Sequence, residues 1–249
     1  MCAHRGVEVV SGEGNVERFS CPYHAWLYDL NGKLIGAPFM KEATGFDLRN
    51  CRLKPLKVET WERWVFVSFN QDVEPFNKFI EHFDQEFGRL RQRDCRLASR
   101  MVTELNCNWK LVNENLMDVY HFQTLHDDSF GAHLDGEKFQ IKLTERGGVS
   151  AYYEAAPMVP EGKSLFGAMP WLGEENINLG CMGHLPPNLH IFGRGDAVTP
   201  FVIWPVAPGH TQIFVHHLFP EEFHSLPDFQ QKLQFYYDYQ IQIVSEDSD

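Results

Sequence analysis

Residues 21–26 read Cys-Pro-Tyr-His-Ala-Trp, and residues 2–6, at the start of the chain, read Cys-Ala-His-Arg-Gly. The two stretches form the pattern Cys-x-His, sixteen further residues, then Cys-x-x-His. Two such pairs on two loops can converge on one metal centre, because thiolate and imidazole are both good ligands of transition metals. The four candidate ligands suit either a zinc ion or a [2Fe–2S] cluster with two histidines on one iron: Cys2, His4, Cys21 and His24.

A second group of candidate ligands lies in the middle of the chain. Residues 108–121 read Asn-Trp-Lys-Leu-Val-Asn-Glu-Asn-Leu-Met-Asp-Val-Tyr-His, and His126 follows. Asp118 and His121 are three residues apart and would share one face of a helix. His126 lies five residues beyond His121, which is a rotation of about 140° on a regular helix. Both imidazoles can therefore reach one metal only if the helix ends or distorts between them. Taken alone, the two histidines could also be ordinary polar residues.

Together these stretches resemble the alpha (catalytic) subunit of Rieske non-haem iron ring-hydroxylating oxygenases. Pro22, Tyr23 and Trp26 fit that family as well as the four ligands do, while a structural zinc site remains the alternative. The resemblance implies that the two cysteines hold one iron of the cluster and the two histidines hold the other. Relatives carry strands before the first loop and continue the last helix, so we expect a chain shortened at both ends.

The resemblance also assigns roles in the second group. His121 and His126 would bind a mononuclear non-haem iron, since two histidines and one carboxylate form the facial triad of such oxygenases. Asp118 would be a bridging carboxylate that carries electrons from His24 of a neighbouring subunit. The third iron ligand should be a late carboxylate, and we choose Asp247. Its rivals are Glu246, Asp249 and Asp238, and the alternative is a solvated acidic tail.

We expect an α+β protein with two domains. Residues 1–72 would form a small all-β Rieske domain, N-terminally incomplete, with a hairpin turn at 29–33 and a strand at 64–69. Residues 73–249 would form a helix-grip (START-like) catalytic domain with an antiparallel sheet, a fold that comes from the resemblance. Its helices are expected at 76–91, 109–121 and 227–244, and its strands at 97–105, 138–144, 149–154, 189–192, 201–205 and 212–219. Residues 155–180 read as a long loop, either a lid or a plain connector.

The resemblance implies an enzyme that uses O₂ and electrons from NAD(P)H to hydroxylate or oxidatively demethylate a small organic molecule. An aromatic substrate, as in aromatic hydrocarbon catabolism, is the first expectation. A reductase, with or without a ferredoxin, would supply electrons to a homotrimer, and a beta subunit is possible. Two residues separate Asn115 from Asp118, which favours monooxygenation over cis-dihydroxylation. Another class also stays open: an electron-transfer or zinc-binding module without catalytic iron, or an inactive copy.

Composition excludes several other classes of protein. The net charge of −12 argues against binding to nucleic acid or to an anionic membrane surface. No apolar run is long enough to span a membrane, and residues 1–6 do not look like a signal peptide. The six cysteines are widely and irregularly spaced, which indicates reduced thiols rather than a disulfide scaffold. A cytoplasmic location follows as the expectation.

Overall fold

The structure is a computed structural model that describes residues 1–144, 148–154 and 164–247. The chain folds into two compact units, Met1–Val73 and Glu74–Asp249. The first unit contains short strands, and the second contains both helices and strands. No helix in the described part of the chain combines the length and apolar character that a membrane crossing needs.

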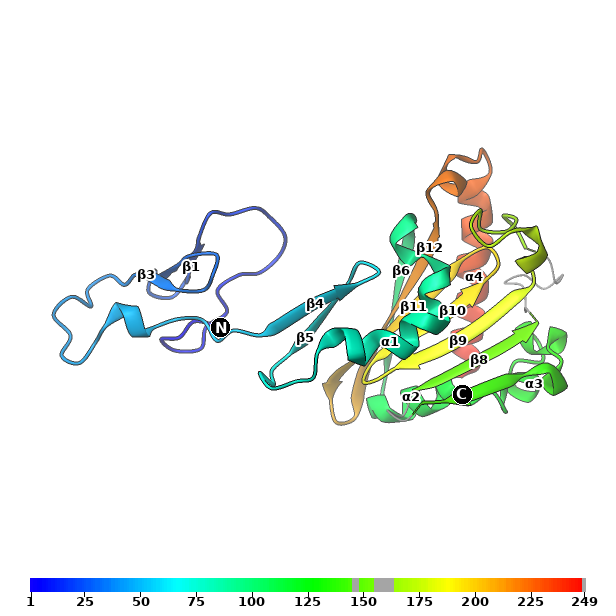
Figure 1. The fold of residues 1–249 in the computed structure, drawn as a ribbon, viewed down its shortest axis with the longest axis horizontal. Helices are drawn as coiled ribbons and strands as arrows, with labels where there is room; N and C mark the ends of the chain where they lie inside the picture. The colour runs from blue at the N-terminus through cyan, green and yellow to red at the C-terminus, as the bar shows by residue number, and fades with distance from the viewer. Residues whose placement is uncertain (145–147, 155–163, 248–249) are drawn as a thin grey trace. The chain divides into compact units, whose positions relative to one another are not determined.

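The first unit consists of short strands, as its turn-rich sequence predicts. One antiparallel sheet has the order β1-β2-β3, and a separate hairpin pairs β4 with β5 (Figure 1). Asp29 shapes the predicted turn, because its Oδ1 accepts hydrogen bonds from the backbone N–H groups of Asn31 and Lys33. Gly32 in that turn has a φ of 76°, which a glycine adopts without strain. The strands are β1 (Phe19–Ser20), β2 (Leu27–Tyr28), β3 (Leu34–Gly36), β4 (Lys57–Trp61) and β5 (Trp64–Ser68).

The second unit is built on a seven-stranded antiparallel sheet with the order β6-β12-β11-β10-β9-β8-β7. Strands β7 to β12 lie next to one another in chain order, so β7 forms one edge of the sheet. Strand β6 forms the other edge, because it pairs with β12, the last strand in the chain. The strands are β6 (Cys95–Leu105), β7 (Gln140–Leu143), β8 (Val149–Glu154), β9 (Leu179–Leu185), β10 (Leu189–Arg194), β11 (Val198–Ala207) and β12 (His210–Pro220). The fold class is therefore the expected one, a small β-domain followed by an α+β domain with an antiparallel sheet.

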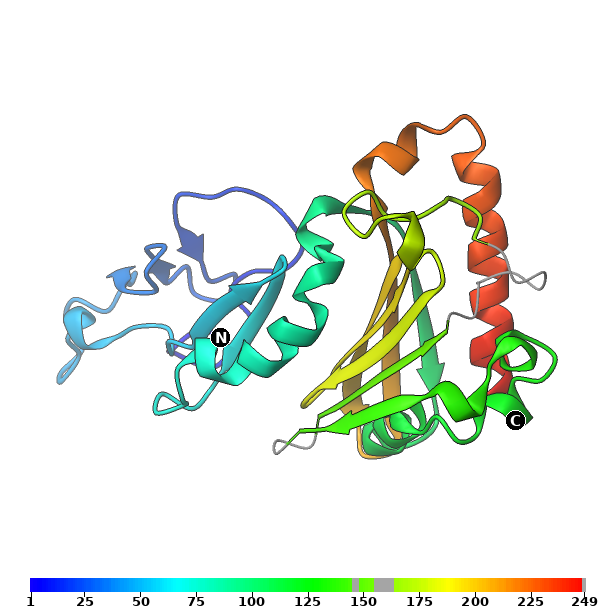
Figure 2. The ribbon, with the colours of Figure 1, turned by 45° about the vertical axis from the view of Figure 1, so that its right-hand side comes forward.

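Helices cover both faces of this sheet. Helices α1 (Phe76–Phe87) and α4 (Phe229–Glu246) lie on opposite sides of it, teal and red in Figure 2. On the α1 side, a Cβ added at Gly183 would lie 2.1 Å from the Phe87 ring, so only glycine admits this helix. On the α4 side, Val112 of α2 (Trp109–Met117) packs into the same apolar cluster as sheet residues such as Ile203 and Val215.

The sequence did not predict β9, whose residues read Leu-Gly-Cys-Met-Gly-His-Leu. The segment has no β-branched residue and two glycines, so its local propensity for a strand is weak. Burial between α1 and the helices of the other face decides its structure instead. Of the loop predicted at 155–180, residues 155–163 lie outside the described residues; the remainder contains a short 3₁₀ helix at Glu174–Asn176 before β9 begins.

The predicted helix at 109–121 is too long by four residues. Helix α2 ends at Met117, because Asp118 has an extended conformation with a ψ of 109°. A second short helix, α3 (Phe122–Leu125), then begins after His121 and ends before His126. The sequence requires the helix to end or distort between His121 and His126. Instead α2 ends before His121, and the short α3 lies between the two histidines and ends before His126. Asp118 and His121 do not share a helical face, although their side chains lie close together.

Close backbone packing holds α3 in place. A Cβ added at Gly131 would lie 2.0 Å from the backbone oxygen of Phe122 and 2.7 Å from that of His126. We expect Gly131→Ala to lower the free energy of unfolding by about 1–3 kcal/mol, because backbone atoms cannot move aside as a side chain can. Chemical denaturation measures this change. Gly209→Ala is the matched control, since nothing lies within 4 Å of its Cβ position, and equal stability of both variants would contradict the prediction.

Candidate metal centres

The two cysteine–histidine loops of the first unit are built alike. The N–H of Cys2 donates to the Val7 carbonyl at 2.7 Å, and the N–H of Cys21 donates to the Trp26 carbonyl at 2.8 Å. Each cysteine carbonyl also accepts a hydrogen bond from the residue four positions later, which has a left-handed φ in both loops, 69° at Gly6 and 55° at Ala25. Two unrelated stretches of sequence therefore present their side chains in the same way.

The loops bring thiols and imidazoles together in separate pairs. Cys2 and Cys21 are 4% and 3% exposed, and their thiols contact each other. The rings of His4 and His24 lie at the surface with their centroids 4.8 Å apart. A single tetrahedral ion would need all four groups around one point, whereas a two-iron cluster needs one pair for each iron. The arrangement therefore fits a [2Fe–2S] cluster, of which the two thiols would hold one iron and the two imidazoles the other.

Tyr28 stabilises the thiolate form of Cys2. Its hydroxyl is fully buried, accepts a hydrogen bond from the N–H of Ala3 at 3.0 Å and lies 3.1 Å from Cys2 Sγ. Since the hydroxyl oxygen already accepts from Ala3, its own proton is available to Cys2. Burial raises the pKa of the Cys2 thiol, but the hydrogen bonds from Tyr28 and from backbone N–H groups outweigh it, so this pKa is lowered. Burial and the thiol raise the pKa of Tyr28 to about 12.

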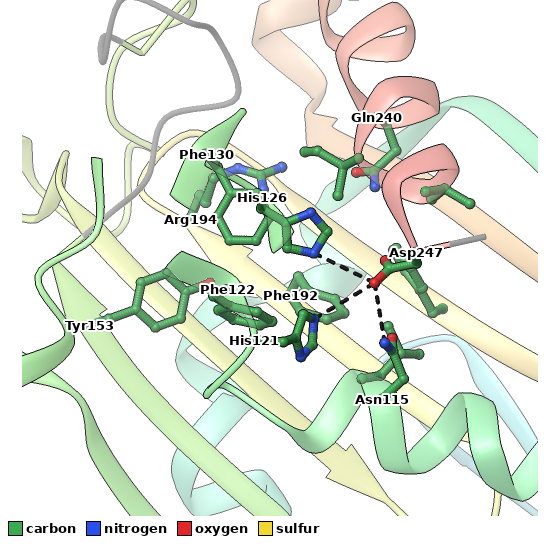
Figure 3. A pocket seen from close by; sticks show the side chains of 14 residues that line it. Asn115, His121, Phe122, His126, Phe130, Tyr153, Phe192, Arg194, Gln240 and Asp247 are labelled. Atoms are coloured by element: carbon green, nitrogen blue, oxygen red, sulfur yellow. Dashed lines mark hydrogen bonds and ion pairs between the residues drawn. The ribbon is translucent and has the colours of Figure 1, made fainter. Parts of the chain in front are cut away.

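In the second unit, His121, His126 and Asp247 form a group that could hold a metal ion. The Nε2 atoms of His121 and His126 lie 3.7 Å and 3.6 Å from the same atom, Oδ1 of Asp247. Figure 3 shows both rings turned toward this carboxylate, which follows the last turn of α4. Asn115 donates a hydrogen bond from Nδ2 to the same oxygen at 3.1 Å. Two imidazoles and one carboxylate are a donor set suited to ferrous iron.

Two further carboxylates contact the Nδ1 atoms of the two imidazoles and orient the rings. Glu246 Oε2 accepts hydrogen bonds from His126 Nδ1 and Ser129 Oγ, both at 2.7 Å. Asp118 Oδ2 lies 3.4 Å from His121 Nδ1, while its Oδ1 accepts from the N–H of Tyr120 at 2.8 Å. In each histidine a carboxylate engages Nδ1 and leaves Nε2 for a metal, an arrangement common around metal-binding histidines.

The structure separates Asp247 from its rivals. Glu246 lies behind His126 rather than facing His121, and Asp238 accepts a hydrogen bond from Gln234 at an exposed position on α4. Asp249 lies outside the described residues. Spacing alone could not make this choice, because consecutive residues at a helix end point in different directions.

An apolar cavity opens beside the three candidate ligands. Aromatic rings supply most of its wall, and Arg194 and Gln240 are polar residues in it that the sequence did not single out. Asn115 and Glu246 were visible in the sequence, but nothing there indicated that one contacts Asp247 and the other His126. The aromatic residues that line the cavity near the candidate ligands are Phe122, Phe130, Tyr153, Phe192 and Phe201 (Figure 3).

We expect Glu246→Gln to weaken iron binding at this site about 10- to 100-fold, because His126 loses the carboxylate that fixes its ring. Iron titration of the metal-depleted protein, followed by equilibrium dialysis, measures the affinity. Asp238→Asn, a carboxylate-to-amide change on the same helix, is the control and should leave the affinity unchanged. An unaltered affinity in Glu246→Gln would show that Glu246 does not position His126.

The chain is similar in sequence to oxygenase subunits. The chain is 35% identical over 131 residues to the carnitine monooxygenase oxygenase subunit of Acinetobacter baumannii, covering 51% of this chain and 35% of that protein. It is 26% identical over 246 residues to the glycine betaine monooxygenase oxygenase subunit of Pseudomonas aeruginosa, covering 86% and 57%. The chain thus spans from about a third to just over half the length of these relatives.

Solved structures share the fold. The quaternary ammonium Rieske monooxygenase CntA in complex with L-carnitine matches with a TM-score of 0.76 and 24% identity, covering 99% of this chain and 64% of that one. Naphthalene 1,2-dioxygenase from Rhodococcus matches with a TM-score of 0.73 and 20% identity, covering 95% and 62%.

Family models cover most of the chain. Residues 1–62 match the Rieske [2Fe-2S] domain, and residues 92–249 match the ring hydroxylating alpha subunit (catalytic domain). The two candidate metal centres lie one in each matched region. The chain belongs to the family of Rieske-type ring-hydroxylating oxygenase alpha subunits.

Proposed function

We propose that this chain is the catalytic component of an oxygenase that hydroxylates or oxidatively demethylates a small organic molecule. The observation that carries the proposal is the convergence of His121 Nε2 and His126 Nε2 on one oxygen of Asp247 beside an apolar cavity. Under this proposal these three residues hold the mononuclear iron, and Cys2, Cys21, His4 and His24 hold the cluster. When bound, the cluster supplies electrons and the iron activates O₂.

The residues around the iron site have separate tasks in this proposal. Glu246 and Asp118 hold the two imidazoles with Nε2 directed at the metal. Asn115 holds the Asp247 carboxylate through its amide. The aromatic wall excludes water and supports an apolar substrate next to the metal. The wall therefore favours substrates with a compact apolar body.

The names of the relatives support this class of reaction. Carnitine and glycine betaine monooxygenases stand beside a salicylate 5-hydroxylase and an anthranilate 1,2-dioxygenase, so both monooxygenation and dioxygenation occur among them. The spacing of Asn115 and Asp118 favours monooxygenation here. A reductase or ferredoxin as electron donor, a homotrimer, the domain division at residues 72 and 73 and a cytoplasmic location remain predictions.

Low-temperature EPR of the dithionite-reduced protein, with iron and zinc quantified on the same sample, tests the proposal. A Rieske-type signal with about three irons per chain would support it. About two irons with the same signal would indicate an electron carrier, and zinc without an iron signal would overturn the oxygenase proposal.

Asp118 is proposed to pass electrons between subunits. Its side chain is 52% exposed and the neighbouring Tyr120 is 91% exposed, so both are accessible to a second copy of the chain. We expect Asp118→Asn to retain both metals but to lose at least about 100-fold in turnover, since an amide beside His121 also disturbs the ring. Stopped-flow reoxidation of the cluster measures the electron transfer directly. Asp135→Asn is an exposed control, and normal reoxidation in Asp118→Asn would refute the role.

A further inference from the structure

Arg194 introduces a positive charge into the apolar cavity beside the candidate iron ligands. It is the last residue of β10 and lies on the same face of the sheet as Phe192, two residues earlier. Only 8% of it is exposed, yet it lines the same cavity as His121 and His126. A guanidinium in such surroundings is costly unless an anion or several hydrogen-bond acceptors compensate it.

The described residues satisfy only part of this guanidinium. Nε donates to the Tyr236 hydroxyl at 2.7 Å, and Nη2 donates to the Thr199 hydroxyl at 3.1 Å and also contacts Tyr236. Asp196 is the one carboxylate in range among the described residues, at 4.0 Å from Nε, and it accepts a hydrogen bond from Ser164. Within the described part of the chain, no acceptor engages Nη1. The group is therefore held firmly by one edge and keeps donors for a ligand.

Gln240 gives a second, independent indication of a polar ligand. This residue of α4 is 5% exposed and lines the cavity that Arg194 lines. Its side-chain amide has no hydrogen-bond partner among the residues that the structure describes. Figure 3 shows it extending from α4 into the cavity. Because the amide opens onto the cavity, a polar ligand there can accept its hydrogen bond.

We propose that Arg194 and Gln240 bind the carboxylate of the substrate, so that this oxygenase acts on small monocarboxylic acids with an apolar body. The inference rests on the proposed function, which makes this cavity the substrate site. Arginine recognises carboxylates by planar, charge-assisted hydrogen bonds, and the low polarity of the surrounding rings strengthens them. The aromatic wall contacts the apolar body, and the ligands of the iron lie along the same cavity. The charge of Arg194 also disfavours a cationic group at this end of the cavity.

Calorimetric binding to the iron- and cluster-loaded full chain, kept anaerobic, tests this inference. The probes are two acids and their amides: benzoate with benzamide, and pivalate with pivalamide. We expect at least one acid to bind about ten- to a hundredfold more tightly than its amide. Arg194→Met should remove that preference. It should weaken binding of the acid about ten- to a hundredfold and leave binding of the amide unchanged. Arg100→Met, at an exposed position on β6, is the matched control and should bind as the unchanged protein does.

Arg194→Met leaves Asp196 without its cation and can lose stability for that reason. Gln240→Leu retains the pair of Arg194 and Asp196, and it should lower acid binding about three- to tenfold. The inference is overturned if neither acid binds more tightly than its amide. It is also overturned if the folded variants keep the full preference for the acid, because the iron alone would then bind the carboxylate. Iron content and the cluster signal are measured on the same samples. Loss of iron with the acid preference intact would contradict only the proposed function.

Discussion

His24→Ala is expected to abolish the Rieske-type EPR signal of the reduced protein. The exposed imidazole of His24 pairs with that of His4, 4.8 Å away between ring centroids, and no other described histidine lies beside them that could replace it. An alanine leaves one iron of the cluster with a missing ligand, whereas iron binding at His121 and His126 should persist. Iron content should fall from about three to about one per chain.

The position of His24 makes this variant easy to interpret. Because the ring lies at the surface, its removal opens no cavity in the core of the first unit, which is formed by residues such as Trp26, Tyr28 and Leu34. His82→Ala removes another exposed histidine, on α1, and should retain the full signal. A normal Rieske spectrum in His24→Ala would refute the assignment of this ligand.

His126→Ala is expected to remove the mononuclear iron and, with it, all turnover. The ring is 1% exposed and makes two of the contacts that define the site, Nε2 toward Asp247 and Nδ1 to Glu246. Alanine leaves two ligands for the metal and also leaves Glu246 without the donor on Nδ1. Iron content should fall by about one per chain while the cluster signal stays unchanged.

A second variant separates metal loss from unfolding. Because His126 is buried, His126→Ala also creates a cavity and can lower the free energy of unfolding. His121→Ala changes a ring whose side chain is 18% exposed, so it should lose the iron with a smaller loss of stability. His210→Ala, at the start of β12 and paired with Glu104, is the control. Retention of about three irons per chain in both site variants would show that these histidines do not hold the metal.

The sequence could indicate most of the candidate ligands of both centres because these residues are close together in the chain. Cys-x-His, Cys-x-x-His and the stretch from Asp118 to His126 are local patterns, and local spacing limits where side chains can point. The same reasoning required a helix end or distortion between His121 and His126, but the long predicted helix already ends at Met117, before His121. Local reasoning did not predict β9. This segment has two glycines and no β-branched residue, so its strand propensity is weak, and its place in the sheet is decided by burial.

Residue types, their order and their local spacing therefore determined the family, the fold class and the candidate ligands of each centre. Only the tertiary structure decided that Asp247 rather than Glu246 faces both Nε2 atoms, that Glu246 and Asp118 orient the rings, and that Arg194 and Gln240 share the cavity. These residues lie in or directly beside β10, α2, α3 and α4. Two residues that touch, Asn115 and Asp247, are 132 positions apart in the chain. Contacts between distant segments depend on how the sheet and helices pack, which local spacing does not specify.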